Sequence, residues 1–142
     1  MRDTLDILLV EDNEGDVELM RRALATAAPP CRILVANNGD QALEALARTG
    51  KYADAPTPDL ILLDINMPRM DGKQFLGVIK EDKRFKAIPV VMFTSSQSPA
   101  DIRECYERHA SCYIVKPFDG REYADALRQV VGFWGRVGEL PD

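Results

Sequence analysis

Four groups of polar side chains could act together, although they lie far apart in the chain. They are the pair Glu11 and Asp12, then Asp64, Thr94 and Lys116. Three carboxylates in one small site repel one another and need a cation to stay ionised. Because no His or Cys accompanies them, the ligand set is all oxygen, and Mg²⁺ is the expected ion.

The other two side chains suit the chemistry of phosphate. Lys116 supplies a point charge for a phosphoryl group, and the Thr94 hydroxyl can donate a hydrogen bond to a phosphoryl oxygen. Asp64 is the central acid and the expected nucleophile, which would form an aspartyl phosphate. Since phosphoryl transfer depends mostly on positioning and charge stabilisation, the set predicts a Mg²⁺-dependent phosphoryl transfer.

Each group follows a short apolar run that is typical of a buried strand. The runs are residues 7–10 before Glu11, 60–63 before Asp64, 88–93 before Thr94, and 112–115 before Lys116. In open α/β sheets, ligands bind at the carboxyl ends of the strands. A carboxylate is costly in a dry core, so Asp64 must reach the surface at its strand's end or meet a cation.

Stretches with helical apolar spacing separate these strands and one further strand at residues 33–35. The expected helices cover residues 14–28, 40–48, 72–81, 99–109 and 119 to about 137. Five strand–helix repeats predict an α/β fold whose parallel sheet is covered by helices on both faces. The expected class is the doubly wound, flavodoxin-like (βα)5 fold with strand order 2-1-3-4-5, which brings the four groups together.

Each group also has a simpler explanation when taken alone. Glu11 and Asp12 could be acids favoured by the dipole of the helix that follows them. Asp64 could be a helix N-cap or a solvated loop acid, Thr94 a turn hydroxyl and Lys116 a surface lysine. Their joint occurrence at four strand ends favours a functional site.

Size, charge and cysteine usage exclude several other classes. A chain of 142 residues predicts one domain over residues 1–142. Its net charge of −5 argues against nonspecific nucleic-acid binding, and no apolar run approaches the roughly 20 residues of a membrane span. The N-terminus has no signal-peptide pattern, and Cys31, Cys105 and Cys112 lack metal-binding spacing. We therefore expect free thiols and a cytoplasmic protein.

Four motifs surround the candidate residues. They are Val10-Glu11-Asp12-Asn13, Leu63-Asp64-Ile65-Asn66-Met67-Pro68-Arg69-Met70-Asp71-Gly72, Pro89-Val90-Val91-Met92-Phe93-Thr94-Ser95 and Tyr113-Ile114-Val115-Lys116-Pro117-Phe118. With these motifs the chain resembles, over essentially its whole length, the receiver domains of two-component response regulators. Glu11 departs from the commoner Asp of that family, but its longer side chain can still hold a metal through water.

The resemblance implies that Asp64 accepts a phosphoryl group from the phosphohistidine of a sensor histidine kinase. It implies that Mg²⁺ is held by Glu11, Asp12, Asp64 and the carbonyl of Asn66. Thr94 and Lys116 would bind the phosphoryl oxygens. Such a protein phosphorylates and dephosphorylates itself, and it is not a turnover enzyme.

The resemblance also implies a switch. Tyr113 would turn inward when Thr94 moves, and this would change the surface formed by the helix at residues 99–109, the strand at 112–115 and the last helix. The Lys116–Pro117 peptide bond would be cis. On the helix at residues 99–109, His109 lies on the apolar stripe, so we expect it to pack in the core and not to relay phosphate.

Further residues resemble the single-domain regulators that are partnered with bacterial phytochromes. They are Ala55-Pro56, Cys112-Tyr113-Ile114, Phe133-Trp134, Val137, Leu140 and Pro141. This resemblance implies that the kinase is a bacteriophytochrome. Because only about five residues follow the last expected helix, we expect no output domain and an unknown downstream protein as the partner.

Two other functions compete with this interpretation. A Mg²⁺-dependent phosphatase of the haloacid dehalogenase type also uses an Asp at a strand end, but it places a second Asp two residues on as general acid. Asn66 occupies that position here and cannot serve. A phosphate-independent interaction module would have the fold with an inactive site, and the intact acid set argues against it.

The last expected helix carries two apolar stripes. One contains Tyr123, Leu127, Val131 and Trp134, and the other contains Ala126, Val130, Phe133, Val137 and Leu140. Because only one stripe can pack fully on the sheet, we expect the second to be exposed and to mediate a protein contact. The alternative is that the C-terminal end folds back over it. We favour a homodimer whose interface contains Val130, Phe133, Trp134 and Val137.

Overall fold

The computed structural model describes residues 3–141, which form a five-stranded parallel sheet in the order β2-β1-β3-β4-β5. The strands are β1 (Leu5–Val10), β2 (Cys31–Ala36), β3 (Leu60–Leu63), β4 (Val90–Thr94) and β5 (Cys112–Val115). The predicted strand order is therefore confirmed. The predicted bounds of β3 and β5 are also correct, because turn residues flank both apolar runs.

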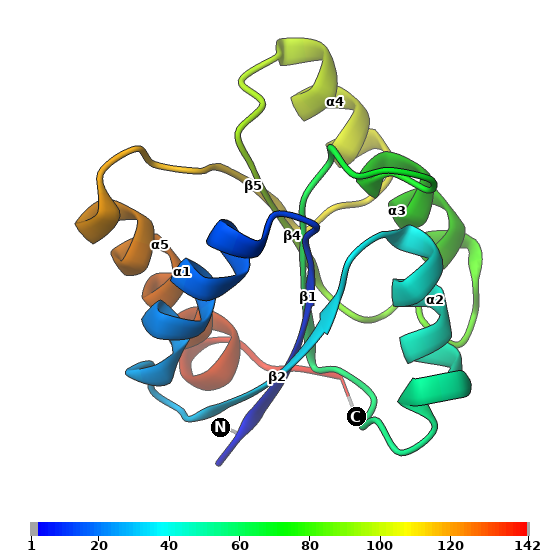
Figure 1. Ribbon diagram of the computed structural model, residues 1–142, viewed down its shortest axis with the longest axis horizontal. Coiled ribbons are helices and arrows are strands. Elements are labelled where there is room, and N and C mark those ends of the chain that lie inside the picture. Colours follow the sequence, from blue (N-terminus) through cyan, green and yellow to red (C-terminus); the bar gives the residue numbers. More distant parts are fainter. Residues whose placement is uncertain (1–2, 142) are drawn as a thin grey trace.

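Helices cover both faces of the sheet, with α1 and α5 on one face and α2 and α3 on the other (Figure 1). The helices are α1 (Glu14–Ala25), α2 (Gly39–Ala47), α3 (Gly72–Glu81), α4 (Pro99–Glu107) and α5 (Gly120–Gly132). A short 3-10 helix, Gly50–Tyr52, follows α2, and a π-helical segment, Phe133–Val137, follows α5. No helix in residues 3–141 is long and apolar enough to span a membrane.

The alternation of side chains along β1 produces two hydrophobic cores. Leu8 and Val10 face the core under α2 and α3, whereas Ile7 and Leu9 face the core under α1 and α5. The central strand β3 is buried along its whole length. Strands with both faces covered are continuously apolar, which explains why the sequence shows short apolar runs without polar alternation.

Capping side chains decide where the helices begin. Asn13 accepts a hydrogen bond from the backbone N–H of Asp16 and so starts α1. Asp71 and Gln74 form a reciprocal capping box at α3. At the other end, α1 stops at Ala25 and not at residue 28, because Pro29 and Pro30 prevent further helical hydrogen bonds.

The predictions for α4 and for one peptide bond are wrong. Cys105 is the only buried residue of α4, and His109 is exposed, because α4 ends at Glu107 and His109 takes a left-handed conformation beyond it. His109 is therefore not a packed core histidine. Among the described residues the cis peptide bond is Ala28–Pro29, so the Lys116–Pro117 bond is not cis. Trans is the preferred form even before proline.

The last helix differs from the expectation in part. Tyr123, Leu127 and Val131 are buried as predicted, but Val130 of the second stripe is also buried. Leu140 packs partly against the α1–α5 core, since the chain turns back after the π-helical segment. The exposed part of the second stripe is thus Phe133 and Val137, which are 49% and 77% exposed.

Candidate functional site

Three carboxylates meet at the carboxyl ends of β1 and β3. Val10 and Leu63 are paired in the sheet, so Glu11 and Asp64, which follow them, emerge side by side. Each of Glu11, Asp12 and Asp64 offers a carboxylate oxygen that lies within 4.8 Å of the other two. Glu11 and Asp64 are buried and Asp12 is exposed. The structure thus brings together the acids that the sequence singled out.

Lys116 reaches into this acid cluster from the end of β5. Its Nζ lies 2.6 Å from Glu11 Oε1, 3.1 Å from Asp16 Oδ2 and 3.6 Å from Asp64 Oδ2. The side chain is 7% exposed. The predicted position of Lys116 beside Asp64 is observed, but its shortest contact is with Glu11.

The burial of these charges determines their protonation. Burial lowers the pKa of Lys116, but its hydrogen bonds to Glu11 and Asp16 and the charges of Asp64 and Glu11 together raise it by more, so the ammonium stays charged. Burial raises the pKa of Glu11 to about 7, and the hydrogen bond from Lys116 opposes that rise. One ammonium does not compensate all the acids around it, so the cluster favours a second cation.

The loop after β3 holds Asp64 in place. The Asp64 backbone N–H donates to Val10 O at 3.0 Å, and its Oδ1 accepts the Ile65 N–H at 2.8 Å. The Gly72 N–H then donates to Ile65 O at 2.9 Å. A Cβ at position 72 would overlap the carbonyl oxygen of Asp64, so glycine is required where α3 starts. Asn66 lies in this loop and is exposed.

Thr94 and Ser96 connect the site to α4. Thr94 is completely buried, and its carbonyl accepts the backbone N–H of Lys116 at 2.7 Å. The Ser96 N–H lies 3.5 Å from Thr94 Oγ1, the Ser96 hydroxyl donates to Asp101 Oδ2 at 2.6 Å, and the Ser96 carbonyl accepts the Tyr113 hydroxyl at 2.9 Å. The sequence did not indicate Ser96, which contacts both of the predicted switch residues.

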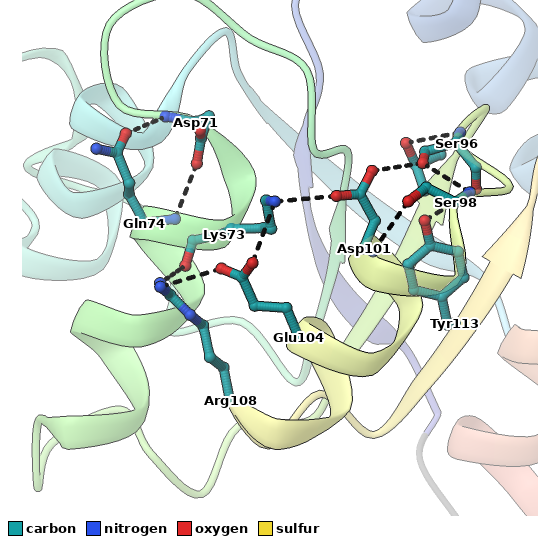
Figure 2. Close-up of polar contacts among 10 residues, drawn as sticks. Asp71, Lys73, Gln74, Ser96, Ser98, Asp101, Glu104, Arg108 and Tyr113 are labelled. Carbon is teal, nitrogen blue, oxygen red and sulfur yellow. Dashed lines mark hydrogen bonds and ion pairs between the residues drawn. The ribbon is translucent and has the colours of Figure 1, made fainter.

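Ionic contacts between α3 and α4 continue this network (Figure 2). Lys73 Nζ lies 2.9 Å from Asp101 Oδ1 and 3.3 Å from Glu104 Oε1. Arg108 pairs with Glu104 at 3.1 Å and donates to the carbonyl of Lys73 at 2.7 Å. Because α4 buries little apolar surface, these polar contacts and those of Ser96 hold it in place.

The acid cluster fits a divalent cation. Its donors are carboxylate oxygens, which are the ligands of hard ions such as Mg²⁺ or Mn²⁺. Of the amines in the described part of the chain, Lys116 is the one paired with Glu11 and Asp64. A doubly wound α/β domain with such acids, a lysine and a buried threonine at its strand ends defines a class of domains that handle phosphoryl groups with a divalent cation.

Comparisons with known proteins identify the family. The response regulator receiver domain model matches residues 7–128. Response regulator Rcp1 of Synechocystis sp. is 35% identical over 135 residues, which cover 95% of this chain and 92% of that protein. The chain belongs to the family of two-component response regulator receiver domains.

Solved structures of relatives extend this finding. The phosphorylated cyanobacterial phytochrome response regulator RcpA superposes with a TM-score of 0.92 at 37% identity, covering 98% of this chain and 99% of that one. The Mn²⁺-bound form of Rcp1 has a TM-score of 0.90 at 34% identity, covering 97% and 99%. The chain is thus a receiver domain of the family that acts in phosphorylation-based two-component signalling, and its whole length is similar to the phytochrome response regulator RcpA.

Proposed function

We propose that Asp64 is the phosphoacceptor and takes its phosphoryl group from the phosphohistidine of a sensor histidine kinase. The observation that supports this proposal best is the position of Asp64: it joins the three-carboxylate cluster and has Lys116 Nζ 3.6 Å from its Oδ2. The N–P bond of the phosphohistidine breaks as a bond forms between phosphorus and an Asp64 carboxylate oxygen. The leaving imidazole takes up a proton.

The neighbouring groups stabilise the charge of the transferred phosphoryl group. Lys116 pairs with one phosphoryl oxygen, and the Thr94 hydroxyl donates to another. Glu11, Asp12, Asp64 and the Asn66 carbonyl hold Mg²⁺, which supplies positive charge to the phosphoryl oxygens. The Mn²⁺-bound form of Rcp1 supports a divalent cation in this family.

Removal of the metal is expected to abolish labelling. Without a cation, the carboxylates of Glu11, Asp12 and Asp64 repel the incoming phosphoryl group, so EDTA should prevent phosphorylation of the protein by acetyl phosphate. Asp12→Ala should have the same effect even when Mg²⁺ is in excess. Intact-mass spectrometry measures the phosphorylated fraction, and re-addition of Mg²⁺ is the control. Undiminished labelling in EDTA would disprove the metal requirement.

The proposed chemistry is that of a switch and not of a turnover enzyme. The aspartyl phosphate persists until the protein hydrolyses it, and the signal is the phosphorylated state itself. Steady hydrolysis of an added phosphate ester would instead favour a Mg²⁺-dependent phosphatase. The partner kinase is proposed to be a bacteriophytochrome, because the relative RcpA is a phytochrome response regulator. Phosphotransfer from purified phytochrome kinases, compared with other histidine kinases, tests this.

We propose that Thr94 and Tyr113 transmit phosphorylation to α4 through Ser96. When the Thr94 hydroxyl moves to the phosphoryl group, it draws the Ser96 backbone with it. The hydrogen bonds of Ser96 to Asp101 and Tyr113, which Figure 2 shows, then rearrange, and α4 changes position. This would alter the α4-β5-α5 surface, which a downstream protein would recognise.

Thr94→Ala is therefore expected to separate labelling from the response of α4. Phosphorylation should change the amide hydrogen exchange of residues 99–107 in the wild type and should leave it unchanged in Thr94→Ala, although Asp64 still accepts the phosphoryl group. The exposed Thr57 lies in the loop before β3, at the edge of the sheet opposite the carboxyl ends of the strands, and provides the control variant Thr57→Ala. An equal response of α4 in Thr94→Ala would contradict this route.

We also propose that the chain forms a homodimer through α5 and the edge strand β5. A groove of about 680 Å³ lies between these elements. Its apolar lining is Cys112, Ile114, Ala126, Val130, Phe133 and Trp134, and the polar residues Ser111, Glu122, Asp125 and Gln129 complete it. Phe133 of this lining is exposed, and so is Val137, four residues farther along the chain. A second copy would place its own α5 against this apolar surface in a two-fold arrangement.

Phe133→Glu is expected to yield a folded monomer that is still phosphorylated. In a dimer the introduced carboxylate would be buried in the proposed interface without a cationic partner. The free energy needed to bury it would exceed the free energy gained from the apolar contacts of the interface. Sedimentation equilibrium at micromolar concentrations measures the mass of the variant and of the wild type. Leu19→Glu changes an exposed leucine of α1 and is the control. A wild-type mass of one chain would refute the dimer.

A further inference from the structure

Asp16 shares Lys116 with the acid cluster but is not one of its three members. It lies in the first turn of α1, and its Oδ2 is 3.1 Å from Lys116 Nζ. The carboxylates that converge within 4.8 Å of one another are those of Glu11, Asp12 and Asp64, without Asp16. Asp16 therefore acts on the lysine and not on the candidate cation position.

Tyr123 of α5 fixes the orientation of Asp16. Its hydroxyl donates to Asp16 Oδ1 at 2.8 Å, so the two oxygens of Asp16 have separate partners. Tyr123 is buried and makes an edge-to-face contact with Phe93, with ring centroids 5.0 Å apart. Burial and the hydrogen bond to Asp16 raise the pKa of Tyr123, so its hydroxyl stays protonated and remains a donor.

Lys116 and a divalent cation compete for the same carboxylate. Lys116 Nζ lies 2.6 Å from Glu11 Oε1, and Glu11 belongs to the cluster that would hold the cation. A cation bound there would repel the ammonium and would compete with it for Glu11, so metal binding would favour a position of Lys116 farther from Glu11. Of its three acidic partners, Asp16 is the one outside the cation position, and it can retain the displaced ammonium.

We propose that Asp16 is a positioning residue for Lys116. It draws the ammonium toward α1, which leaves Glu11 and Asp64 accessible to the cation, and Tyr123 holds it in the required orientation. The inference rests on the cation site described under the proposed function. It does not depend on phosphorylation, so metal binding alone can test it.

The test measures the Mg²⁺ affinity of the full chain by isothermal titration calorimetry. Asp16→Asn should weaken binding about tenfold, since partners that orient the groups of a metal site contribute roughly 10–100-fold to affinity. Glu14→Gln removes the same charge from the same turn of α1, where the side chain is exposed, and should change the affinity less than about twofold. Tyr123→Phe leaves the charge unchanged and should weaken binding by a smaller factor than Asp16→Asn.

The decisive measurement repeats Asp16→Asn in a Lys116→Met background. If Asp16 acts through Lys116, the effects of the two substitutions are coupled. In the Lys116→Met background, Asp16→Asn should then lower the Mg²⁺ affinity no more than Glu14→Gln does. The inference would be overturned if Asp16→Asn still lowered the Mg²⁺ affinity tenfold in the Lys116→Met background. It would also be overturned if Asp16→Asn and Glu14→Gln lowered the affinity of the wild type equally. If the Asp16→Asn variant does not fold, Tyr123→Phe is measured in its place, in the wild type and in the Lys116→Met background. Its loss of Mg²⁺ affinity should then disappear in the Lys116→Met background. A wild type that binds no Mg²⁺ would disprove the cation site itself.

Discussion

Asp64→Asn is expected to eliminate phosphorylation by acetyl phosphate or by a phosphorylated kinase, with at least about a hundredfold less label than the wild type. The amide is nearly isosteric, so the backbone bond to Val10 is kept and Asn Oδ1 can still accept the Ile65 N–H. The lost feature is the negatively charged oxygen that must attack phosphorus. Fold stability should therefore change little while the chemistry disappears.

Intact-mass spectrometry after incubation with acetyl phosphate and Mg²⁺ measures this effect. Asp54→Asn changes an exposed acid in the loop before β3 and should label like the wild type. The label of the wild type should be sensitive to hydroxylamine, as expected for an acyl phosphate. Label that persists in Asp64→Asn would place the phosphoacceptor at another residue.

Gly72→Ala is expected to lower the free energy of unfolding by about 3 kcal/mol, at the upper end of overpacking costs, and to impair phosphorylation. The new methyl group would overlap the Asp64 carbonyl oxygen and would come within 2.9 Å of the Ile65 Cα. Both contacts are with backbone atoms, so no side-chain rotation can relieve them. The start of α3 and Asp64 would have to move apart.

Gly132→Ala is the matched control for this effect. Gly132 has helical dihedral angles, φ −61° and ψ −41°, and an added Cβ would meet no atom within 4 Å. The same substitution should therefore stabilise the protein by roughly 0.5–1 kcal/mol, because alanine loses less conformational entropy. Urea unfolding of the two variants compares them directly. A Gly72→Ala protein as stable as the wild type would contradict the close backbone approach at Asp64.

The predicted elements were most accurate where local chemistry specifies them. The apolar run of β3 is enclosed by turn residues, and the Asp71 cap with Gln74 starts α3, so residues 60–63 and 72–81 were predicted with their observed bounds. Strand–helix alternation and the rules of parallel sheets were enough to predict the strand order. The meeting of Glu11, Asp12 and Asp64 followed from that order, since each acid comes directly after a strand.

The apolar spacing of α4 led to a wrong prediction, because periodicity shows which residues share a face but not how much of that face is covered. Ile102 and Tyr106 remain partly or largely exposed, and α4 is held by the polar contacts of Asp101 and Glu104. The backbone beyond Glu107 turns at His109, which removes this residue from the helical stripe. The extent of burial depends on neighbouring elements, which a local pattern does not contain.

By itself the sequence determined the fold class, the strand order and the residues at the strand ends, because hydrophobic periodicity and turn chemistry act over a few neighbouring residues. Only the tertiary structure decided the partners of Lys116. Glu11 and Asp16 lie 105 and 100 positions away from it, and Tyr123 lies 107 positions from Asp16. Asp16 lies in the first turn of α1, and nothing in the residues around it marks it as a partner of Lys116. The packing of β1, α1 and α5 on the angstrom scale decides which of the nearby acids the Lys116 ammonium contacts. Side-chain types and their spacing in the sequence do not specify that packing.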